Sequence, residues 1–185
     1  MPTPIRDAFC NFCGTKYPEP LTYPRTCQAC QQKVWANPIP VSVVIVPVED
    51  AGRTGILVVR RAIPPQIGKL GIVGGFLEAH ESWQQGGARE TREETGVHID
   101  AATLTPLWFA SSEPNPHRVL LFSVAPALPV SALPPYVRDA ETSERGLVYG
   151  PGGLEGVFAF STHVEAAKRY FGARGVTAMH DFAAR

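Results

Sequence analysis

Long hydrophobic runs are missing from this chain of 185 residues. No uninterrupted apolar run exceeds four residues, as in 43–46, whereas a membrane-spanning helix needs about 20 and the core of a signal peptide about 7 to 15. We therefore expect a protein that is not exported, that works in the cytoplasm and that has no membrane partner.

An excess of charge of either sign is also missing. Lys and Arg number 17, Asp and Glu number 17, and charged residues make up only 18% of the chain. This balance argues against a chain disordered by self-repulsion and against a globally basic protein dedicated to nucleic acid. With 44% hydrophobic residues, the chain can form one main core with a small appendage, but it is too short for two ordinary domains.

Cysteine is absent from the 155 residues that follow Cys30. The four cysteines form two Cys-x-x-Cys pairs, Cys10 with Cys13 and Cys27 with Cys30, separated by thirteen residues. Four thiolates complete a tetrahedral shell that suits Zn²⁺ and leaves no open position for catalysis. The alternatives, two disulfides or a redox pair, would need an export signal or a βαβ pattern, which we do not find. We predict a structural zinc ribbon in residues 1–38.

The same segment is rich in aromatic residues, namely Phe9, Phe12, Tyr17, Tyr23 and Trp35. In so small a unit, aromatic rings usually form a miniature core, and we expect that arrangement here. The alternative is that the rings are platforms on which nucleobases stack. Four basic residues against two acidic ones in residues 1–40 give that alternative only faint support.

The rest of the chain, 39–185, is expected to form an α/β domain with a mixed sheet. The run 41–48 is rich in β-branched residues and nearly continuously apolar, which predicts a central strand buried on both faces. The glycine-rich segment 64–75 is expected to be a loop. A second helix is expected to end at Gly172. The strands expected after the central one are 56–61, 104–110 and 118–125.

Ser82-Trp83-Gln84-Gln85 has the form of a capping box, and together with Gly96 it predicts a helix over 82–95. Gly86 and Gly87 each cost about 1 kcal/mol relative to Ala inside a helix. This helix must therefore be stabilised by its contacts with the rest of the protein.

Three carboxylates share one face of the expected helix. At about 100° per residue, Glu90, Glu93 and Glu94 fall within an arc of about 100°. Like charges on adjacent turns destabilise an isolated helix, so we expect a hard divalent cation such as Mg²⁺ among them. Arg89 lies four residues before Glu93, the spacing for an ion pair that would orient the carboxylate. The alternative is a solvated charged face.

The wider spacing resembles the signature of the Nudix hydrolases: Gly, five residues, Glu, seven residues, then Arg-Glu-U-x-Glu-Glu-x-Gly-U, where U is bulky and apolar. Thr91, at the first U, is the one departure. The resemblance implies an α/β/α sandwich with a mixed sheet, preceded here by the small zinc ribbon, and a metal-dependent hydrolysis at phosphorus. The matching residues are Gly75, Glu81, Arg89, Glu90, Glu93, Glu94, Gly96 and Val97.

The resemblance also implies a role for individual residues. Glu90 and Glu94 would bind catalytic Mg²⁺ or Mn²⁺, with the backbone carbonyl of Gly74 as a further ligand. Glu93 would orient or deprotonate the attacking water. Glu141 stands roughly where some relatives place another metal-binding glutamate. The implied catalytic residues are Arg89, Glu90, Glu93 and Glu94.

A zinc ribbon before such a domain is similar to the arrangement in NADH pyrophosphatases and in shorter ribbon-bearing Nudix proteins that act on dinucleotides. The implied function is cleavage of the pyrophosphate bond of a nucleoside diphosphate linked to another moiety, as in FAD, NADH or ADP-ribose. Trp108 and Phe109 would line the substrate pocket, unless they belong to the core. NADH is disfavoured, because 112–118 keep only the serine and two prolines of the matching NADH pyrophosphatase element, and because only nine residues precede Cys10.

The alternative function is a nucleotide-sensing regulator, or a nucleic-acid adaptor, with a Nudix-like domain that does not cleave. The intact carboxylates favour the enzyme, and zero net charge disfavours a dedicated nucleic-acid partner. Capped RNA stays open as a substrate beside small nucleotides. The resemblance also suggests a homodimer.

Overall fold

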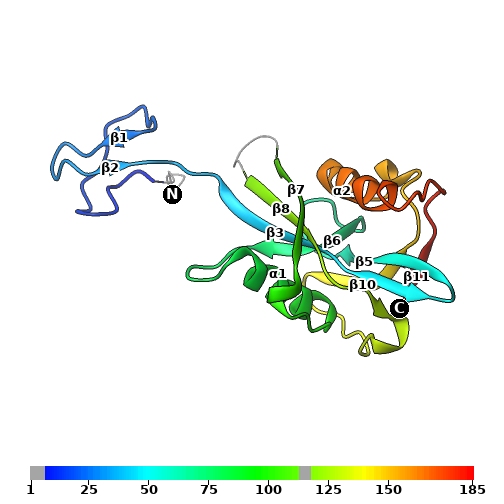
Figure 1. The fold of residues 1–185 in the computed structure, drawn as a ribbon. Helices are drawn as coiled ribbons and strands as arrows, with labels where there is room; N and C mark the ends of the chain where they lie inside the picture. The colour runs from blue at the N-terminus through cyan, green and yellow to red at the C-terminus, as the bar shows by residue number, and fades with distance from the viewer. Residues whose placement is uncertain (1–6, 113–117) are drawn as a thin grey trace. The chain divides into compact units, whose positions relative to one another are not determined.

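The computed structural model describes residues 7–112 and 118–185 and divides the chain into two compact units (Figure 1). We call Met1–Pro38 the N-terminal unit and Ile39–Arg185 the sandwich unit. Neither α-helix in the described part of the chain has the length and apolarity needed to cross a membrane.

The N-terminal unit contains one short antiparallel ribbon, formed by β1 (Arg25–Thr26) and β2 (Lys33–Val34). A tight turn precedes the ribbon and a second one connects its two strands: the N–H of Gly14 donates to the carbonyl of Cys10 at 2.8 Å, and that of Gln31 to the carbonyl of Cys27 at 2.9 Å. The small core consists of the buried Cys10, Tyr17 and Cys27, with three partly buried neighbours, Leu21, Cys30 and Val34.

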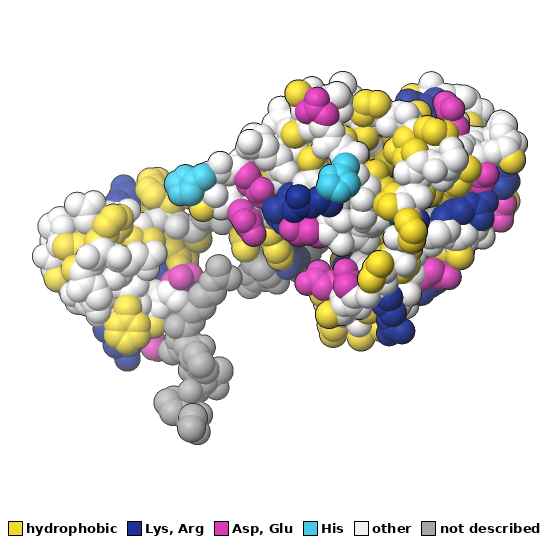
Figure 2. Space-filling view, turned by 90° about the horizontal axis from the view of Figure 1, so that it is seen from below, with side chains coloured by type: hydrophobic (Ala, Val, Ile, Leu, Met, Phe, Trp, Pro, Cys, Tyr) yellow, Lys and Arg dark blue, Asp and Glu magenta, His cyan; other side chains and the backbone are white. Residues whose placement is uncertain are grey.

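The predicted aromatic core of this unit is therefore wrong for four of its five rings. Only Tyr17 is buried, whereas Phe9, Phe12, Tyr23 and Trp35 are exposed. The physical reason is that cysteine sulfurs and a single ring already fill so small an interior. Figure 2 shows hydrophobic side chains at the surface of this unit.

The sandwich unit is built on a mixed sheet, as the sequence predicts. The neighbours run in the order β11, β10, β5, β6, β3, β8, β7, and β4 and β9 pair beside β5. The pair β3 and β8 is parallel, while the other neighbours along this order are antiparallel. The strands are β3 (Ile39–Ile45), β4 (Pro47–Asp50), β5 (Arg53–Arg61), β6 (Leu70–Phe76), β7 (Thr105–Ser111), β8 (Arg118–Val124), β9 (Leu128–Pro129), β10 (Thr142–Val148) and β11 (Phe182–Ala184).

Two helices, α1 (Trp83–Thr95) and α2 (Ser161–Gly172), lie on opposite faces of this sheet and complete an α/β/α sandwich (Figure 1). The second helix ends at Gly172, as predicted. Three short 3₁₀ helices cover Ala101–Thr103, Val130–Ala132 and Leu154–Gly156.

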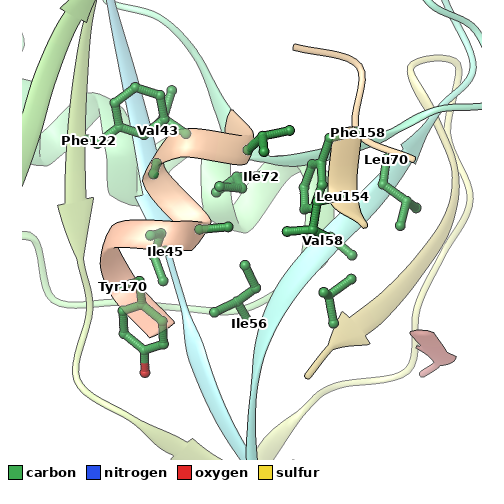
Figure 3. Close-up of a cluster of buried hydrophobic side chains, with 14 of the residues drawn as sticks. Val43, Ile45, Ile56, Val58, Leu70, Ile72, Phe122, Leu154, Phe158 and Tyr170 are labelled. Atoms are coloured by element: carbon green, nitrogen blue, oxygen red, sulfur yellow. The ribbon is translucent and has the colours of Figure 1, made fainter. Parts of the chain in front are cut away.

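Successive residues of the central strand point into two different cores, because side chains alternate along a strand. Val43 and Ile45 join the cluster beneath α2, where Tyr170 is also buried (Figure 3). Val44 and Val46 join a second cluster on the side of α1. The prediction of a strand buried on both faces is confirmed.

Two expectations about the strands need correction. The expected loop 64–75 ends early, because β6 already begins at Leu70. Gly74 and Gly75 of this strand allow β3 and Glu90 to come close. The expected strand 41–48 is two strands, since β3 pairs with β6 and β8 whereas β4 pairs with β5 and β9. The chain changes partner at Val46, whose carbonyl accepts a hydrogen bond from the N–H of Leu57 at 2.9 Å.

Candidate active site

The helix that carries the three carboxylates has both predicted caps. The backbone N–H of Gln85 donates to Ser82 Oγ at 3.2 Å, and the N–H of Ser82 donates to Gln85 Oε1 at 2.8 Å. Gly96 ends the helix with φ of 74°, a left-handed conformation that favours glycine. Glu81 therefore lies just before the helix, and a regular helical angle does not apply to it.

The buried face of α1 consists of glycine and threonine and has no apolar stripe. A Cβ at Gly87 would lie 2.7 Å from Val44 Cγ2 and 2.8 Å from Ser42 Oγ, so glycine allows the helix to lie close to β3. Thr91 is fully buried, and its hydroxyl donates to the carbonyl of Gly87 at 2.7 Å. Thr91 can thus replace an apolar residue without leaving an unpaired hydroxyl.

Two of the three helical carboxylates lie against β6. Glu94 Oε2 accepts a hydrogen bond from the backbone N–H of Gly74 at 3.0 Å. The carboxylate of Glu90 occupies the space into which a side chain at Gly75 would project. Gly74 has φ of 150°, and a Cβ there would collide with the Ser42 carbonyl of β3. The adjacent glycines therefore let the strand pass directly beneath the acidic side chains.

Arg89 links the acidic residues of the motif. Its guanidinium lies 2.9 Å from Glu81, 2.8 Å from Glu90 and 3.1 Å from Glu93, and it donates to the carbonyl of Phe76 at 2.9 Å. The predicted pairing of Arg89 with Glu93 is present, and sequence spacing did not reveal its bond to Glu81. These bonds raise the pKa of Arg89 and hold that of Glu81 below its usual range. The guanidinium is thereby fixed in orientation.

Burial disfavours the charged forms of Glu90 and Glu94. The pKa of Glu94 is raised to about 8, chiefly because its carboxyl group is buried. The Gly74 hydrogen bond opposes this effect, and the charges of Glu90 and Glu141 add to it. Burial likewise raises the pKa of Glu90. Oxygen donors held close together in this way fit a hard divalent cation, which would stabilise their charged forms.

Glu141 comes to this site from a distant part of the chain. It lies just before β10, and its backbone carbonyl accepts a hydrogen bond from the N–H of Ala62 at 2.7 Å, which ties it to the end of β5. Its charge acts on both Glu90 and Glu94. The structure thus brings Glu141 toward the helical carboxylates.

The two aromatic residues predicted to line the substrate pocket face different surroundings. Trp108 is partly buried, stacks on Phe122 with ring centroids 5.5 Å apart, and lies beneath the Arg169 guanidinium at 4.6 Å. Phe109, next along β7, is 74% exposed. They do not share one pocket wall, because neighbouring residues of a strand point to opposite faces. Residues 113–117, which carry most of the departure from NADH pyrophosphatases, lie outside the described residues.

The four cysteines of the N-terminal unit form a second candidate metal centre. Their sulfurs all lie within 4.8 Å of one another, with Cys10 and Cys30 at 3.7 Å and Cys13 and Cys27 at 3.7 Å. A tetrahedral site with Zn–S bonds of about 2.3 Å separates its sulfurs by about 3.8 Å. Among the described residues no other group of three or more metal-ligating side chains is so compact. The described carboxylates of the sandwich unit do not form such a compact group, and Glu90 is paired with Arg89.

Comparison with known proteins identifies relatives of the sandwich unit. A family model for the NUDIX domain matches residues 38–147. The NAD-capped RNA hydrolase NudC of Salmonella heidelberg (strain SL476) is 26% identical over 109 residues, which cover 58% of this chain and 38% of the relative. NudC of Salmonella typhi is likewise 26% identical over 109 residues. The match thus spans well under half the length of these curated relatives.

Solved structures share the fold. A NUDIX hydrolase from Nitrosomonas europaea is 27% identical, with a TM-score of 0.63 over 93% of this chain and 96% of that one. The NUDIX domain of Shewanella oneidensis NrtR, solved with ADP ribose, is 15% identical, with a TM-score of 0.61 over 75% of this chain and 89% of that one. A C. elegans Ap4A hydrolase is 15% identical, with a TM-score of 0.59 over 74% and 98% of the two chains.

Proposed function

The chain belongs to the NUDIX family, whose model matches 38–147 of its 185 residues, and on that basis we propose that it is a metal-dependent pyrophosphohydrolase. Its substrate is a nucleoside diphosphate linked to a second moiety, such as FAD, NADH or ADP-ribose, and its products are two monophosphates. The observation that carries this proposal is the pair of partly buried carboxyl groups, Glu90 and Glu94, held against Gly74 and Gly75 with raised pKa values.

In this proposal Glu90, Glu94 and Glu141, with the backbone carbonyl of Gly74, hold catalytic Mg²⁺ or Mn²⁺. The bound ion supplies charge neutralisation at the phosphate oxygens and lowers the pKa of water. The charge of Glu141 contributes to the raised pKa of both Glu90 and Glu94, which supports this assignment.

Glu93 is the residue we assign to the attacking water. Its side chain is 51% exposed, so water reaches it, and Arg89 holds it from one side at 3.1 Å. A carboxylate oxygen positioned in this way can orient the water and accept its proton. Arg89 pairs with Glu81, Glu90 and Glu93, so its positive charge offsets the repulsion between these carboxylates.

For the N-terminal unit we propose a zinc ribbon over 1–38 that binds Zn²⁺ through Cys10, Cys13, Cys27 and Cys30, followed by the Nudix domain over 39–185. The spacing of the four sulfurs supports this proposal. Four protein ligands close the coordination shell, so this metal serves folding and takes no part in hydrolysis.

A panel of FAD, NADH, ADP-ribose and NAD-capped RNA, assayed by phosphatase-coupled phosphate release with Mg²⁺ or Mn²⁺, tests the function. We expect phosphate release from at least one compound. In Glu94→Gln we expect activity to fall by about 100-fold or more, since mutation of a residue that only supports a metal ligand already costs about 10–100-fold in activity or metal affinity. The matched control is Glu165→Gln, a glutamate of α2 paired with Arg169 on the surface.

The departure at 112–118 leads us to expect the slowest release from NADH. If the wild type bound a nucleotide of the panel but released no phosphate from any compound, the proposal would be wrong. The protein would then be a sensor.

A further inference from the structure

Exposed aromatic rings are concentrated in the N-terminal unit. Among the described residues, the exposed rings of this unit are Phe9, Phe12, Tyr23 and Trp35, at 56%, 64%, 39% and 60% exposure. The sandwich unit, although several times longer, exposes only Phe76 and Phe109 among its described aromatic residues. Single exposed apolar residues are ordinary, but this density in one small unit indicates an interaction surface.

Packing within the unit accounts for Tyr23, whose ring lies against the same Arg25 guanidinium that covers Tyr17, but it does not explain Phe9, Phe12 and Trp35. The sulfurs of Cys10 and Cys27 and the ring of Tyr17 already form its buried centre. Phe12 projects from the turn between Cys10 and Cys13, and Trp35 follows β2, so both rings are presented by backbone that the cysteines and the ribbon hold in place. Such rings are preorganised for a partner, because little conformational freedom is lost when they bind.

Cations accompany three of the four rings. The Lys33 ammonium lies 5.3 Å from the centroid of Trp35, and the Arg25 guanidinium lies 4.2 Å from that of Tyr23. Lys16 is the β-bridge partner of Phe9. Aromatic rings with adjacent positive charges are suited to bind a partner in which flat aromatic faces alternate with negative charges. A single strand of nucleic acid has this chemistry, whereas a second copy of this neutral chain does not complement the cations.

We propose that the exposed rings Phe9, Phe12 and Trp35, with Lys16 and Lys33, form a stacking platform for single-stranded RNA. The inference rests on the proposed function, since RNA that begins with a nucleotide cap carries the pyrophosphate bond which the sandwich unit would cleave. Bases of the RNA would stack on the rings, and the cations would contact phosphates. The chain would then bind capped RNA more tightly than a free dinucleotide.

Fluorescence anisotropy with a labelled 12-nucleotide RNA bearing a 5′ hydroxyl tests the platform in the full-length protein. This RNA has no pyrophosphate bond, so binding is measured independently of hydrolysis. We expect Phe12→Ala/Trp35→Ala to raise Kd by about 10-fold for each ring removed. We also expect Lys33→Ala to reduce the slope of log K against log salt by about 0.7.

Val137→Ala, at an exposed residue of the sandwich unit, is the matched control and should bind RNA like the wild type. Unchanged zinc content in the double variant, measured by native mass spectrometry, shows that its N-terminal unit is folded. Equal RNA affinity of the double variant and the wild type would overturn the proposal, as would tighter binding of DNA of the same sequence. It would also be overturned if the double variant changed the sedimentation of the protein but not its affinity for RNA.

Hydrolysis measured on the same samples separates this inference from the proposed function. The double variant should turn over a free dinucleotide like the wild type and show a raised KM only for capped RNA. A wild type that binds the 12-nucleotide RNA but hydrolyses nothing would refute the enzymatic proposal alone. A wild type that hydrolyses dinucleotides but does not bind the RNA would refute the platform alone.

Discussion

Gly75, which has no side chain, leaves the space in which the carboxylate of its neighbour Glu90 lies. The Glu90 carboxylate occupies the place where a Cβ would be. Gly71, on the same strand, has only His163 Nδ1 within 4 Å of such a Cβ, at 3.9 Å, which is an ordinary contact. Gly71 and Gly75, two of the three glycines of β6, therefore form a matched pair, of which only Gly75 touches the acidic site.

We expect Gly75→Ala to displace Glu90 and to raise the Mg²⁺ concentration needed for half-maximal hydrolysis by about 10-fold or more, the scale seen when the surroundings of a metal site are disturbed. Titration of activity with Mg²⁺ measures the effect. Gly71→Ala should leave the titration unchanged. Equal titrations for the two variants would contradict the assignment of Glu90 to the metal.

His163 is a buried imidazole that no feature of the sequence distinguishes from the other four histidines. Its Nδ1 accepts a hydrogen bond from the N–H of Ile72 at 3.0 Å, and Phe122 and Phe160 flank the ring. Burial, together with the smaller effect of the nearby positive charge of Arg61, lowers its pKa to about 3. The folded protein therefore keeps this ring neutral.

This shift predicts a dependence of stability on pH. Between about pH 6.5, the pKa of an unfolded histidine, and pH 3, the unfolded chain binds a proton that the folded chain does not. The contribution of His163 is complete above this window and is lost as the pH falls, by about 1.4 kcal/mol per pH unit. In urea unfolding between pH 6.5 and 4.5, the free energy of unfolding should fall less steeply for His163→Gln than for the wild type. For exposed His98→Gln it should fall as steeply as for the wild type.

At the scale of the element, the glycines on the buried face of α1 allow this helix to lie close to the sheet. Ala at Gly87 would gain about 1 kcal/mol of helix propensity, but overpacking a well-filled core costs about 1–3 kcal/mol. Since its Cβ would meet Val44 and the Ser42 hydroxyl, the second effect should prevail.

We expect Gly87→Ala to lower the free energy of unfolding by about 1 kcal/mol, measured by chemical denaturation. Gly172→Ala, at the end of α2, meets no atom within 4 Å and should leave stability equal or slightly raised. A stabilised Gly87→Ala protein would show that the contact of α1 with β3 is loose.

The helix and the central strand were predictable because their signals are local. The capping box at Ser82 and the spacing of Arg89 and Glu93 involve residues within a few turns of one another. The strand β6 was not predictable, since its glycines are typical of a loop unless one knows that Glu90 lies over Gly75. β10 was also missed, although the buried run of Leu147, Val148 and Tyr149 was a usable signal.

At the scale of the whole molecule, the approach of Glu141 to Glu90 could not be derived from spacing, because it depends on β10 pairing with β5. The cysteine pairs were predictable, since their spacing alone describes a four-sulfur site. The exposure of the aromatic rings around them was not, because composition does not reveal how little interior a unit of this size has.

Because the two units have separate cores, they should respond separately to loss of the cysteine ligands. Cys10→Ser/Cys30→Ser should unfold the N-terminal unit, which is too small to fold without its metal. In ¹H–¹⁵N correlation spectra we expect the signals of 7–38 to collapse to random-coil positions, while those of 39–185 remain in place. Loss of dispersion in both sets would show that the units fold as one.

The boundary between the units has a mechanical consequence. The N-terminal unit ends at Pro38 and β3 begins at the next residue, and residues 35–38, which connect β2 to β3, have no regular structure. Tension applied to the N-terminal unit, for example by a tethered strand being pulled away, would load β3 along its length. That strand is hydrogen-bonded on one side to β6 and on the other to β8. Because a force along the strand loads these hydrogen bonds in shear, they would have to break together and not one by one.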